Sequence, residues 1–509
     1  MSHQIISGNR ALSYKDLQGN VLKIASGFDG LGIGVGDTMA LMLRNDHAFF
    51  EASLAAGVLG AYPVPINWHY NAEETLYILN DSDAKILVIH ADLLHRLKNS
   101  IPENIQIIVV KTPGEIQKAY GLDEAICSVP PESREWQAWF NAHSPWQNPP
   151  KPAPASMIYT SGTTGYPKGV RRHVPSPEMS QKTLQIRKQM WGSQRGAIVL
   201  ITGPLYHSAP NAFGLTHVKA ETDIVMQARF DAEEMLHLIA KHKVTHLHIV
   251  PTMFVRLLKL PEQTKGRYDI SSLKFVIHGA APCSPDVKRE MMNWFGPIIH
   301  EYYGSTETGI SVLSTPDDWF KHPGTVGKVC PWAKLLILGE AGEILPAGEI
   351  GDIYTVVDYQ ADFTYHKNEA KRFEIEQKGL VTIGDKGYLT ADGYLFLCDR
   401  KNDMVISGGV NIYPAEIEKE LILMPGVKDC AIFGIPDEEF GESLIAYLEP
   451  EIGSELTEEG VKQFLRGKVA GYKVPHLIKF QNNLPREDSG KIFKRKLRDP
   501  YWEKLGRLI

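Results

Sequence analysis

Hydrophobic and polar positions follow two periods in the first two thirds of the chain, one typical of helices and one typical of strands. Residues 231–243 open with Asp231 and place Glu234 three positions later, which is the pattern of a capped helix start. Residues 244–250 then alternate apolar and polar positions and are rich in β-branched side chains, which predicts a strand. Further strands are predicted at 84–90, 273–278 and 298–303, and a buried helix at 46–60. This mixture is typical of α/β layers.

The pattern changes past residue 330. Short apolar segments at 333–338, 351–357 and 387–397 are separated by glycine turns, which predicts a β-rich subdomain. It ends at the charged run 399–403, and a charged run between two strand-like segments is a suitable place for a hinge.

The last hundred residues are predicted to form a unit of their own. Pro414 stands at the first turn of a helix at 415–424, which Pro425 and Gly426 end. A strand at 430–435 and a helix near 458–468 follow. From 486 to 507 eight Lys or Arg stand against four Asp or Glu, and we interpret this tail as a solvated basic face.

One stretch indicates chemistry. The apolar residues 157–159 lead into a segment dominated by Ser, Thr and Gly, and Lys168 follows. Small residues let backbone N–H groups approach an anion, hydroxyls add donors, and a lysine adds charge, so the stretch predicts a phosphate-holding loop after a strand. The alternatives are a polar surface loop and a Walker A loop. The latter requires Gly-Lys followed by Ser or Thr, and no Gly-Lys pair in the sequence has that continuation.

Two further strands also run into small-residue turns. The strand at 273–278 precedes Gly279-Ala-Ala-Pro282, and the segment at 298–303 precedes Gly304-Ser-Thr-Glu307. Open α/β sheets bind ligands at the carboxyl ends of their strands, so we expect these turns and the phosphate loop to converge.

Two connecting segments contain no chemistry of their own. Residues 144–154 are rich in proline and predict an extended strap before the phosphate loop. The glycines at 30–36 never satisfy Gly-x-Gly-x-x-Gly and indicate a tight connection rather than a dinucleotide site.

Composition sets the class of protein. At 509 residues the chain should divide into at least two domains, and 43% hydrophobic and 22% charged residues are ordinary for a globular protein. The formal net charge of -6 gives no basic field, so no nucleic-acid partner is expected. No apolar run approaches the roughly 20 residues that span a bilayer, so no integral membrane contact is expected.

The five cysteines, at 127, 283, 330, 398 and 430, are scattered and suit a reducing compartment, which places the protein in the cytoplasm. Histidines 237, 242, 246 and 248 crowd one region and raise the alternative of a metal site. They lack a paired carboxylate or cysteine set, so we interpret them as polar residues at the edge of the core.

The motifs together resemble a known family. Tyr-Thr-Ser-Gly-Thr-Thr-Gly-x-Pro-Lys-Gly at 159–169, Tyr-Gly-Ser-Thr-Glu at 303–307, Gly-Asp at 384–385, Asp-Arg at 399–400 and Gly-Lys at 490–491 stand in the order found in the adenylate-forming superfamily. Within it, residues 399–418 and 472–475 are most similar to fatty-acid and aromatic-acid CoA ligases. The resemblance implies a large N-terminal domain of layered α/β sheets with a β-rich subdomain at 1–399, a hinge at 400–403, and a small α+β C-terminal lid domain at 404–509.

The resemblance also implies roles for individual residues. A loop would hold the β- and γ-phosphates of ATP with Thr160, Ser161, Gly162, Thr163, Thr164, Gly165 and Lys168. The adenine would meet Gly279, Ala280, Ala281 and Tyr303, and the ribose would meet Asp385 and Arg400. Thr306 would bind the α-phosphate, Glu307 would help to hold Mg²⁺, and His207 would gate the substrate carboxylate. Lys491 would be the catalytic lysine that bridges the acid and the α-phosphate.

The implied activity is that of a ligase with two half-reactions. The carboxylate of a hydrophobic acid, aromatic or of medium to long chain, attacks ATP to give an acyl-adenylate and pyrophosphate, and the thiol of coenzyme A then displaces AMP. Between the steps the lid would rotate about Asn402, where many relatives carry Asp or Lys, and would present Gly408 and Gly409 to the pantetheine arm. The alternatives are transfer of the acyl group to a carrier protein or an amine, and an inactive nucleotide-binding regulator. A monomer or homodimer is expected.

Overall fold

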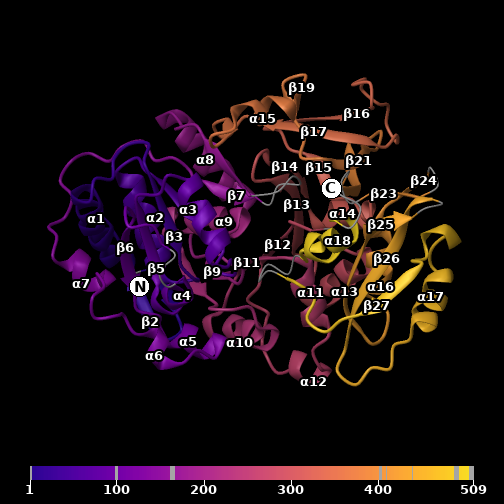
Figure 1. Ribbon diagram of the computed structural model, residues 1–509, viewed down its shortest axis with the longest axis horizontal. Coiled ribbons are helices and arrows are strands. Elements are labelled where there is room, and N and C mark those ends of the chain that lie inside the picture. Colours follow the sequence, from indigo (N-terminus) through magenta and orange to yellow (C-terminus); the bar gives the residue numbers. More distant parts are fainter. Residues whose placement is uncertain are drawn as a thin grey trace.

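Within the part of the chain that the structure describes, the strands form four sheets, which helices cover (Figure 1). The computed structural model describes residues 3–97, 101–160, 167–281, 283–400, 404–407, 410–437, 440–486 and 492–503, with the backbone alone at 399, 400, 406 and 411.

The first sheet has four parallel strands in the order β4-β3-β5-β6. Its strands are β3 (Thr38–Met42), β4 (Tyr62–Pro65), β5 (Ile86–His90) and β6 (Gln106–Val110). The helices of this region are α1 (Tyr14–Gly30), α2 (His47–Val58), α3 (Ala72–Asp81), α4 (Ala91–Leu97), α5 (Gly114–Tyr120), α6 (Glu124–Cys127) and α7 (Trp136–Asn141). The glycine-rich segment at 30–36 connects α1 to β3, as predicted, with Gly32 and Gly36 at positive φ.

The second sheet is the largest of the four, with 15 strands among the described residues. They run in the order β19-β20-β17-β21-β22-β15-β14-β13-β12-β11-β9-β10-β1-β2, and β16 pairs with β17. The strands are β1 (Gln4–Ser7), β2 (Arg10–Ser13), β9 (Ile198–Ile201), β10 (Asp223–Met226), β11 (His246–Ile249), β12 (Phe275–His278), β13 (Ile299–Ser305), β14 (Gly309–Ser314), β15 (Gly327–Val329), β16 (Ala333–Leu338), β17 (Gly351–Val357), β19 (Glu376–Gln377), β20 (Leu380–Val381), β21 (Asp385–Leu389) and β22 (Tyr394–Arg400). Its helices are α8 (Pro177–Met190), α9 (Ser208–Lys219), α10 (Ala232–His242), α11 (Pro251–Leu258), α12 (Glu262–Lys265), α13 (Pro285–Phe295), α14 (Pro316–Lys321) and α15 (Glu369–Glu374).

The middle of this sheet confirms the predicted α/β layers. Strands β1, β10, β9, β11, β12 and β13 are parallel neighbours. The alternation in β11 separates its faces: Leu247 and Ile249 belong to the core cluster under α10, α11 and α13, whereas the ring of His248 lies against Trp191 in the cluster shared with α1, α2 and α9. Asp231 caps α10 as predicted by accepting a hydrogen bond from the backbone N–H of Glu234 at 2.8 Å.

The predicted β-rich subdomain exists but is not a separate sheet. Its strands β16, β17, β19, β20, β21 and β22 extend the large sheet, because β22 pairs with β15 and β15 pairs with β14. The predicted strand at 387–397 is a hairpin of β21 and β22 that turns at 390–393.

A small third sheet joins the region around the predicted phosphate loop to the rest of the protein. It contains β7 (Ile158–Thr160), β8 (Lys168–Arg172) and β18 (Phe363–Tyr365), in the order β18-β8-β7. The proline-rich residues 144–154 before β7 form neither helix nor strand, and backbone N–H groups of Trp146 and Lys151 donate to the carbonyl oxygens of Leu22 and Val58.

The C-terminal unit has a sheet and a core of its own. Its elements are β23 (Val405–Ser407), β24 (Val410–Ile412), α16 (Pro414–Leu421), β25 (Val427–Asp437), β26 (Gly441–Pro450), α17 (Glu458–Arg466), the 3-10 helix η2 (Gly471–Lys473), β27 (Leu477–Phe480) and α18 (Lys494–Trp502). Figure 1 shows this unit in yellow beside α11 and α13. Lys259, just after α11, reaches across to it and forms an ion pair with Glu451 at 2.7 Å.

The basic tail differs from its interpretation as a solvated face. Residues 494–502 form α18, whose Leu497 and Trp502 are buried, and the indole of Trp502 donates to the carbonyl of Gly434 at 3.1 Å. The apolar residues of this helix face β25, and Lys494 at its start forms an ion pair with Glu418 of α16 at 2.8 Å. No helix within the described part of the chain is both long and apolar enough to cross a bilayer.

Candidate active site

Nine of the predicted site residues line one cleft of about 3390 Å³. The small sheet, the carboxyl ends of β12 and β13, the start of α9, the β21 edge and the C-terminal unit all contribute to its walls. The predicted residues that line it are Thr160, Lys168, His207, Ala280, Ala281, Tyr303, Thr306, Glu307 and Asp385. Segments more than 200 residues apart in the sequence therefore meet at the edge of the sheets, as the strand-and-turn pattern predicts.

Glu307 lies where the small sheet meets the large one. Its Oε1 accepts hydrogen bonds from the hydroxyl of Thr160 at 3.2 Å and from that of Tyr365 at 3.3 Å. Burial, and next the charge of Glu307, raise the pKa of Tyr365 above its ordinary value, so the phenol stays a donor. A carboxylate among hydroxyls is a set of hard oxygen donors, which fits Mg²⁺.

Thr306 is tied to the start of α9. Its hydroxyl donates to the hydroxyl of Ser208, the first residue of that helix, at 3.0 Å. His207 is the N-cap residue of the same helix, and its ring centroid lies 4.4 Å from that of Tyr206. Thr306 and His207, which have different predicted roles, therefore both lie at the N-terminus of α9, where backbone N–H groups favour negative charge.

Tyr303 and Asp385 form a hydrogen-bonded pair. Both side chains are buried, and the Tyr303 hydroxyl donates to Oδ2 of Asp385 at 2.9 Å. A flat ring beside a carboxylate provides a surface for stacking and an acceptor for hydroxyl groups, which suits a nucleoside.

Lys168 begins β8 at the wall of the cleft. Its ammonium nitrogen lies 5.7 Å from the ring centroid of Tyr365, within the range of a cation–π contact. Burial, followed by the nearby charge of Lys371, lowers the pKa of Lys168 below its ordinary value. A polyanionic ligand would oppose both effects because it favours the charged form.

The turn after β12 differs in detail from the prediction. Ala280 and Ala281 line the cleft, and Ala280 holds the positive φ of +68°. Gly279 instead faces inward, because a Cβ there would lie 2.5 Å from the ring of Tyr302. Glycine at 279 therefore makes room for a core tyrosine rather than for a base.

The turn after β13 also differs. Strand β13 continues through Gly304 and Ser305, so only residues 306–308 form the turn to β14. A Cβ at Gly304 would lie 2.2 Å from the carbonyl oxygen of Gly309, and this close approach of two strands explains the glycine.

Several predicted residues lie outside the described residues. They are Ser161, Gly162, Thr163, Thr164 and Gly165 of the predicted phosphate loop, Asn402 of the hinge, Gly408 and Gly409 of the lid, and the catalytic lysine Lys491. For Arg400 the backbone is described and pairs with Asp385 across β21 and β22.

The histidines considered for a metal lie in separate surroundings. His248 is buried and its Nε2 lies 3.0 Å from the Tyr302 hydroxyl. His246 stacks on Phe275, whereas the ring of His237 meets that of Tyr268 edge to face. In the described ranges no group of three or more His, Cys, Asp or Glu side chains could hold a metal ion.

Three residues of the site escaped the sequence reasoning: Ser208, Tyr365 and Arg172. The last donates to the carbonyl oxygens of Thr306 and Glu307 at 2.7 and 2.8 Å. Ser208 follows the predicted His207, but Tyr365 lies on a strand too short to give a periodic signal, and Arg172 reads as an exposed charge.

Most of the chain matches one family of enzymes. The family described as AMP-binding enzyme matches residues 2–357, and its C-terminal domain, described as AMP-binding enzyme C-terminal domain, matches residues 416–491. The interval between the two matches, residues 358–415, includes the predicted hinge at 400–403.

Individual relatives align along nearly the whole chain. Feruloyl-CoA synthase of an Amycolatopsis species is 30% identical over 504 residues, which cover 96% of this chain and 94% of the relative. The 2-succinylbenzoate–CoA ligase of Bacillus licheniformis is 30% identical over 500 residues, with 97% and 96% covered. The crystal structure of ATP-bound MatB from Rhodopseudomonas palustris superimposes with a TM-score of 0.81 at 26% identity, with 98% of this chain and 96% of that chain covered.

Proposed function

The chain belongs to the AMP-binding enzyme family, and from this premise we propose that it is an ATP-dependent, AMP-forming acid–CoA ligase that acts on a hydrophobic carboxylic acid. Coenzyme A, ATP and Mg²⁺ are the small molecules that this activity requires.

One observation supports the proposal most strongly. Thr160, Lys168, the adjacent pair Thr306 and Glu307, and Asp385 come from four separate segments and line a single cleft. A nucleoside triphosphate and its metal ion need the groups that these residues supply. They are the ammonium group of Lys168, the hydroxyls of Thr160 and Thr306, the carboxylate of Glu307 and the buried pair of Asp385 with Tyr303.

The first half-reaction joins two anions. A carboxylate oxygen of the acid attacks the α-phosphorus of ATP, the bond to the β-phosphate oxygen breaks, and pyrophosphate leaves with that electron pair. Lys168 and the loop before it would hold the leaving phosphates, and the hydroxyl of Thr306 would donate to the α-phosphate. The protein contributes alignment and positive charge, because two anions must approach each other.

Magnesium would bind beside Glu307 and would neutralise phosphate charge when present. Tyr303 and Asp385 would hold the nucleoside, the ring by stacking and the carboxylate by accepting from ribose hydroxyls. Arg400 at the end of β22 would add a contact to the ribose.

The second half-reaction forms the carbon–sulfur bond. The thiol sulfur of coenzyme A attacks the carbonyl carbon of the acyl-adenylate, AMP leaves with the original carboxylate oxygen, and the thiol proton passes to solvent. We propose that the C-terminal unit is a lid that delivers Lys491 for the first step and Gly408 and Gly409 for the second, with residues 400–403 as its hinge. The match boundaries at 357 and 416 agree with such a division.

The acid would lie beside α9. Ala209 and Pro210 line the cleft after His207, and the neighbouring Tyr206 ring is buried. Small and apolar side chains leave room for a ring or an acyl chain and give it no charged partner, which favours a hydrophobic acid.

A screen tests the proposal. Purified protein, ATP, Mg²⁺ and coenzyme A are incubated with aromatic and with medium- and long-chain acids, and AMP is measured. With at least one acid we expect AMP to form, and we expect its formation to require coenzyme A, one molecule of which is consumed for each AMP released. Rapid turnover with a carrier protein or an amine in place of coenzyme A would move the acceptor to that class, and no AMP or pyrophosphate with any acid would favour a nucleotide-binding regulator.

A further inference from the structure

Each of the three strands of the small sheet contributes one side chain that hydrogen-bonds to the Thr306–Thr308 turn. Thr160 of β7 and Tyr365 of β18 donate to the carboxylate of Glu307. Arg172 of β8 donates through Nη2 to the carbonyl oxygens of Thr306 at 2.7 Å and of Glu307 at 2.8 Å. Two of the strands, β7 and β8, also flank the predicted phosphate loop.

Arg172 is fixed on a second side as well. Its Nη1 donates to the carbonyl oxygen of Ala361 at 2.8 Å, just before β18. One planar guanidinium therefore joins β8, the approach to β18 and the turn after β13. A rigid fork of donors orients its acceptors better than a lysine ammonium can.

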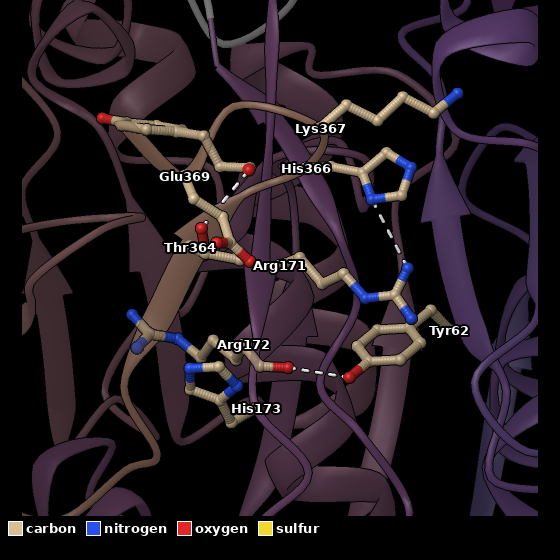
Figure 2. A pocket seen from close by; sticks show the side chains of 9 residues that line it. Tyr62, Arg171, Arg172, His173, Thr364, His366, Lys367 and Glu369 are labelled. Atoms are coloured by element: carbon tan, nitrogen blue, oxygen red, sulfur yellow. Dashed lines mark hydrogen bonds between the residues drawn. The ribbon is translucent and has the colours of Figure 1, made fainter. Parts of the chain in front are cut away.

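The neighbouring arginine points the other way. Figure 2 shows the Arg171 side chain running toward Tyr62 and His366, while the Arg172 guanidinium lies on the opposite side of the strand. Arg171 donates to the carbonyl oxygen of Gly36 at 2.8 Å and lies 4.2 Å above the Tyr62 ring. The alternation of β8 thus sends one arginine to the first sheet and the other to the Glu307 turn.

Arg172 shares its face of β8 with Lys168. The two are four positions apart on one strand, which spans about 13 Å at the usual rise. Lys168 faces the cleft where the leaving phosphates are proposed to bind, and Arg172 holds the backbone that carries Thr306 and Glu307. A single short strand therefore sets the distance between the two halves of the phosphate site.

We propose that Arg172 is a positioning residue for adenylation: by holding the carbonyl oxygens of Thr306 and Glu307 it keeps the α-phosphate donor and the metal-binding carboxylate in register with Lys168. This inference rests on the proposed function. It adds a residue that touches neither ATP nor the acid and acts through the turn. Burial lowers the pKa of Arg172 to about 10, so the guanidinium still carries its charge at neutral pH and its hydrogen bonds are of the stronger, charge-assisted kind.

Arg172→Met removes all three hydrogen bonds, and Arg171→Met is its matched control. The control removes an arginine from the same strand but leaves the Glu307 turn untouched. For Arg172→Met we expect kcat for adenylation to fall about tenfold to hundredfold, the loss that a charged hydrogen-bonding partner typically causes. The Mg²⁺ concentration for half-maximal rate should rise, whereas KM for ATP should change less than about threefold because Tyr303 and Asp385 remain.

Three readouts separate positioning from mere loss of structure. Thermal unfolding reports stability, ATP-dependent pyrophosphate release reports adenylation, and thioester formation from a supplied acyl-adenylate reports the second half-reaction. We expect only adenylation and its Mg²⁺ dependence to distinguish Arg172→Met from Arg171→Met, and the second half-reaction to stay within about threefold of the wild-type rate.

Arg172→Lys keeps the charge and covers the case in which the methionine variant does not fold. It should retain the native Tm more closely and still require more Mg²⁺ than the wild type. Equal kcat and equal Mg²⁺ dependence in Arg172→Lys and wild type, or equal losses in Arg172→Met and Arg171→Met, would overturn the inference. A wild-type protein without acid-dependent pyrophosphate release would overturn the proposed function itself, and the inference with it.

Discussion

Replacing Asp385 by asparagine tests the nucleoside site with little change of shape. Asp385 accepts a hydrogen bond from the buried Tyr303 hydroxyl at 2.9 Å. Asparagine keeps the size of the side chain and one oxygen for that bond. It removes the negative charge and turns one acceptor into a donor, which faces a ribose hydroxyl less favourably.

The expected magnitude follows from the number of bonds affected. A hydrogen bond to a charged group contributes about 1.5 to 3 kcal/mol, and the exchange of one carboxylate oxygen for an amide removes one such bond to the ribose. Since about 1.4 kcal/mol corresponds to a factor of ten, KM for ATP should rise about tenfold to hundredfold. Tyr303→Phe keeps the ring and loses only the hydroxyl, so its increase in KM should be about threefold to tenfold.

Pyrophosphate release at saturating acid and coenzyme A, with ATP varied, measures both parameters. The double variant completes a cycle: because the two side chains touch, their losses should not add, and a coupling of about 0.5 to 3 kcal/mol is expected. The thermal unfolding midpoint serves as the control for folding. An unchanged KM for ATP in folded Asp385→Asn would refute the ribose assignment, and strictly additive losses would refute the idea that the pair acts as one unit.

Three more changes give separate tests. Glu307→Gln keeps acceptors for Thr160 and Tyr365 but weakens metal binding, so the Mg²⁺ concentration for half-maximal adenylation should rise about tenfold, and an unchanged requirement would place the metal elsewhere. Lys491→Ala should abolish adenylation and spare thioester formation from a supplied acyl-adenylate, whereas equal loss of both half-reactions would count against a moving lid. Burial lowers the pKa of His248 to about 4 from its ordinary 6.5, so the unfolded chain binds more protons between these values. This contribution to the free energy of unfolding is complete above pH 6.5 and declines by about 1.4 kcal/mol per pH unit as the pH falls toward 4. The free energy of unfolding measured in urea should therefore depend less steeply on pH in His248→Gln than in the wild type. Equal slopes in the two proteins would refute the assignment.

Local signals predicted much of the architecture because they act over a few residues. The cap at Asp231 set the start of α10, and alternation in β11 set which side of the sheet received His248. Proline at the first turn of α16 likewise marked its beginning. Such features depend on backbone hydrogen bonding and side-chain period, which a sequence displays directly.

The structural features that the sequence did not predict depend on contacts between segments far apart in the chain. Strand β22 could have closed a separate subdomain, and its register against β15 made it part of the large sheet. Gly279 read as an opening for a base, and the ring of Tyr302 from the next strand occupies the space above it. The tail at 494–502 read as a basic face because charges dominate its composition, and Leu497 and Trp502 are sufficient to dock it as a helix.

The candidate site shows the same division. Lys168, Thr306 and Glu307 lie in motifs whose residue types indicate phosphate and metal binding, so the sequence alone predicts them. Arg172 stands three positions beyond the first motif, and its partners come from distant parts of the chain, the β13–β14 turn and Ala361. Residues that act through backbone carbonyls leave no pattern of their own, since every residue offers a carbonyl.

The central claim is that the cleft joins the carboxylate of an acid to the α-phosphate of ATP. The most direct measurement uses an acid substrate labelled with ¹⁸O in its carboxylate, with ATP, Mg²⁺ and coenzyme A, and reads the isotope in the products by mass spectrometry. Attack of the carboxylate on the α-phosphorus predicts one ¹⁸O atom in AMP and none in pyrophosphate. Unlabelled AMP, or label in inorganic phosphate or pyrophosphate, would contradict it.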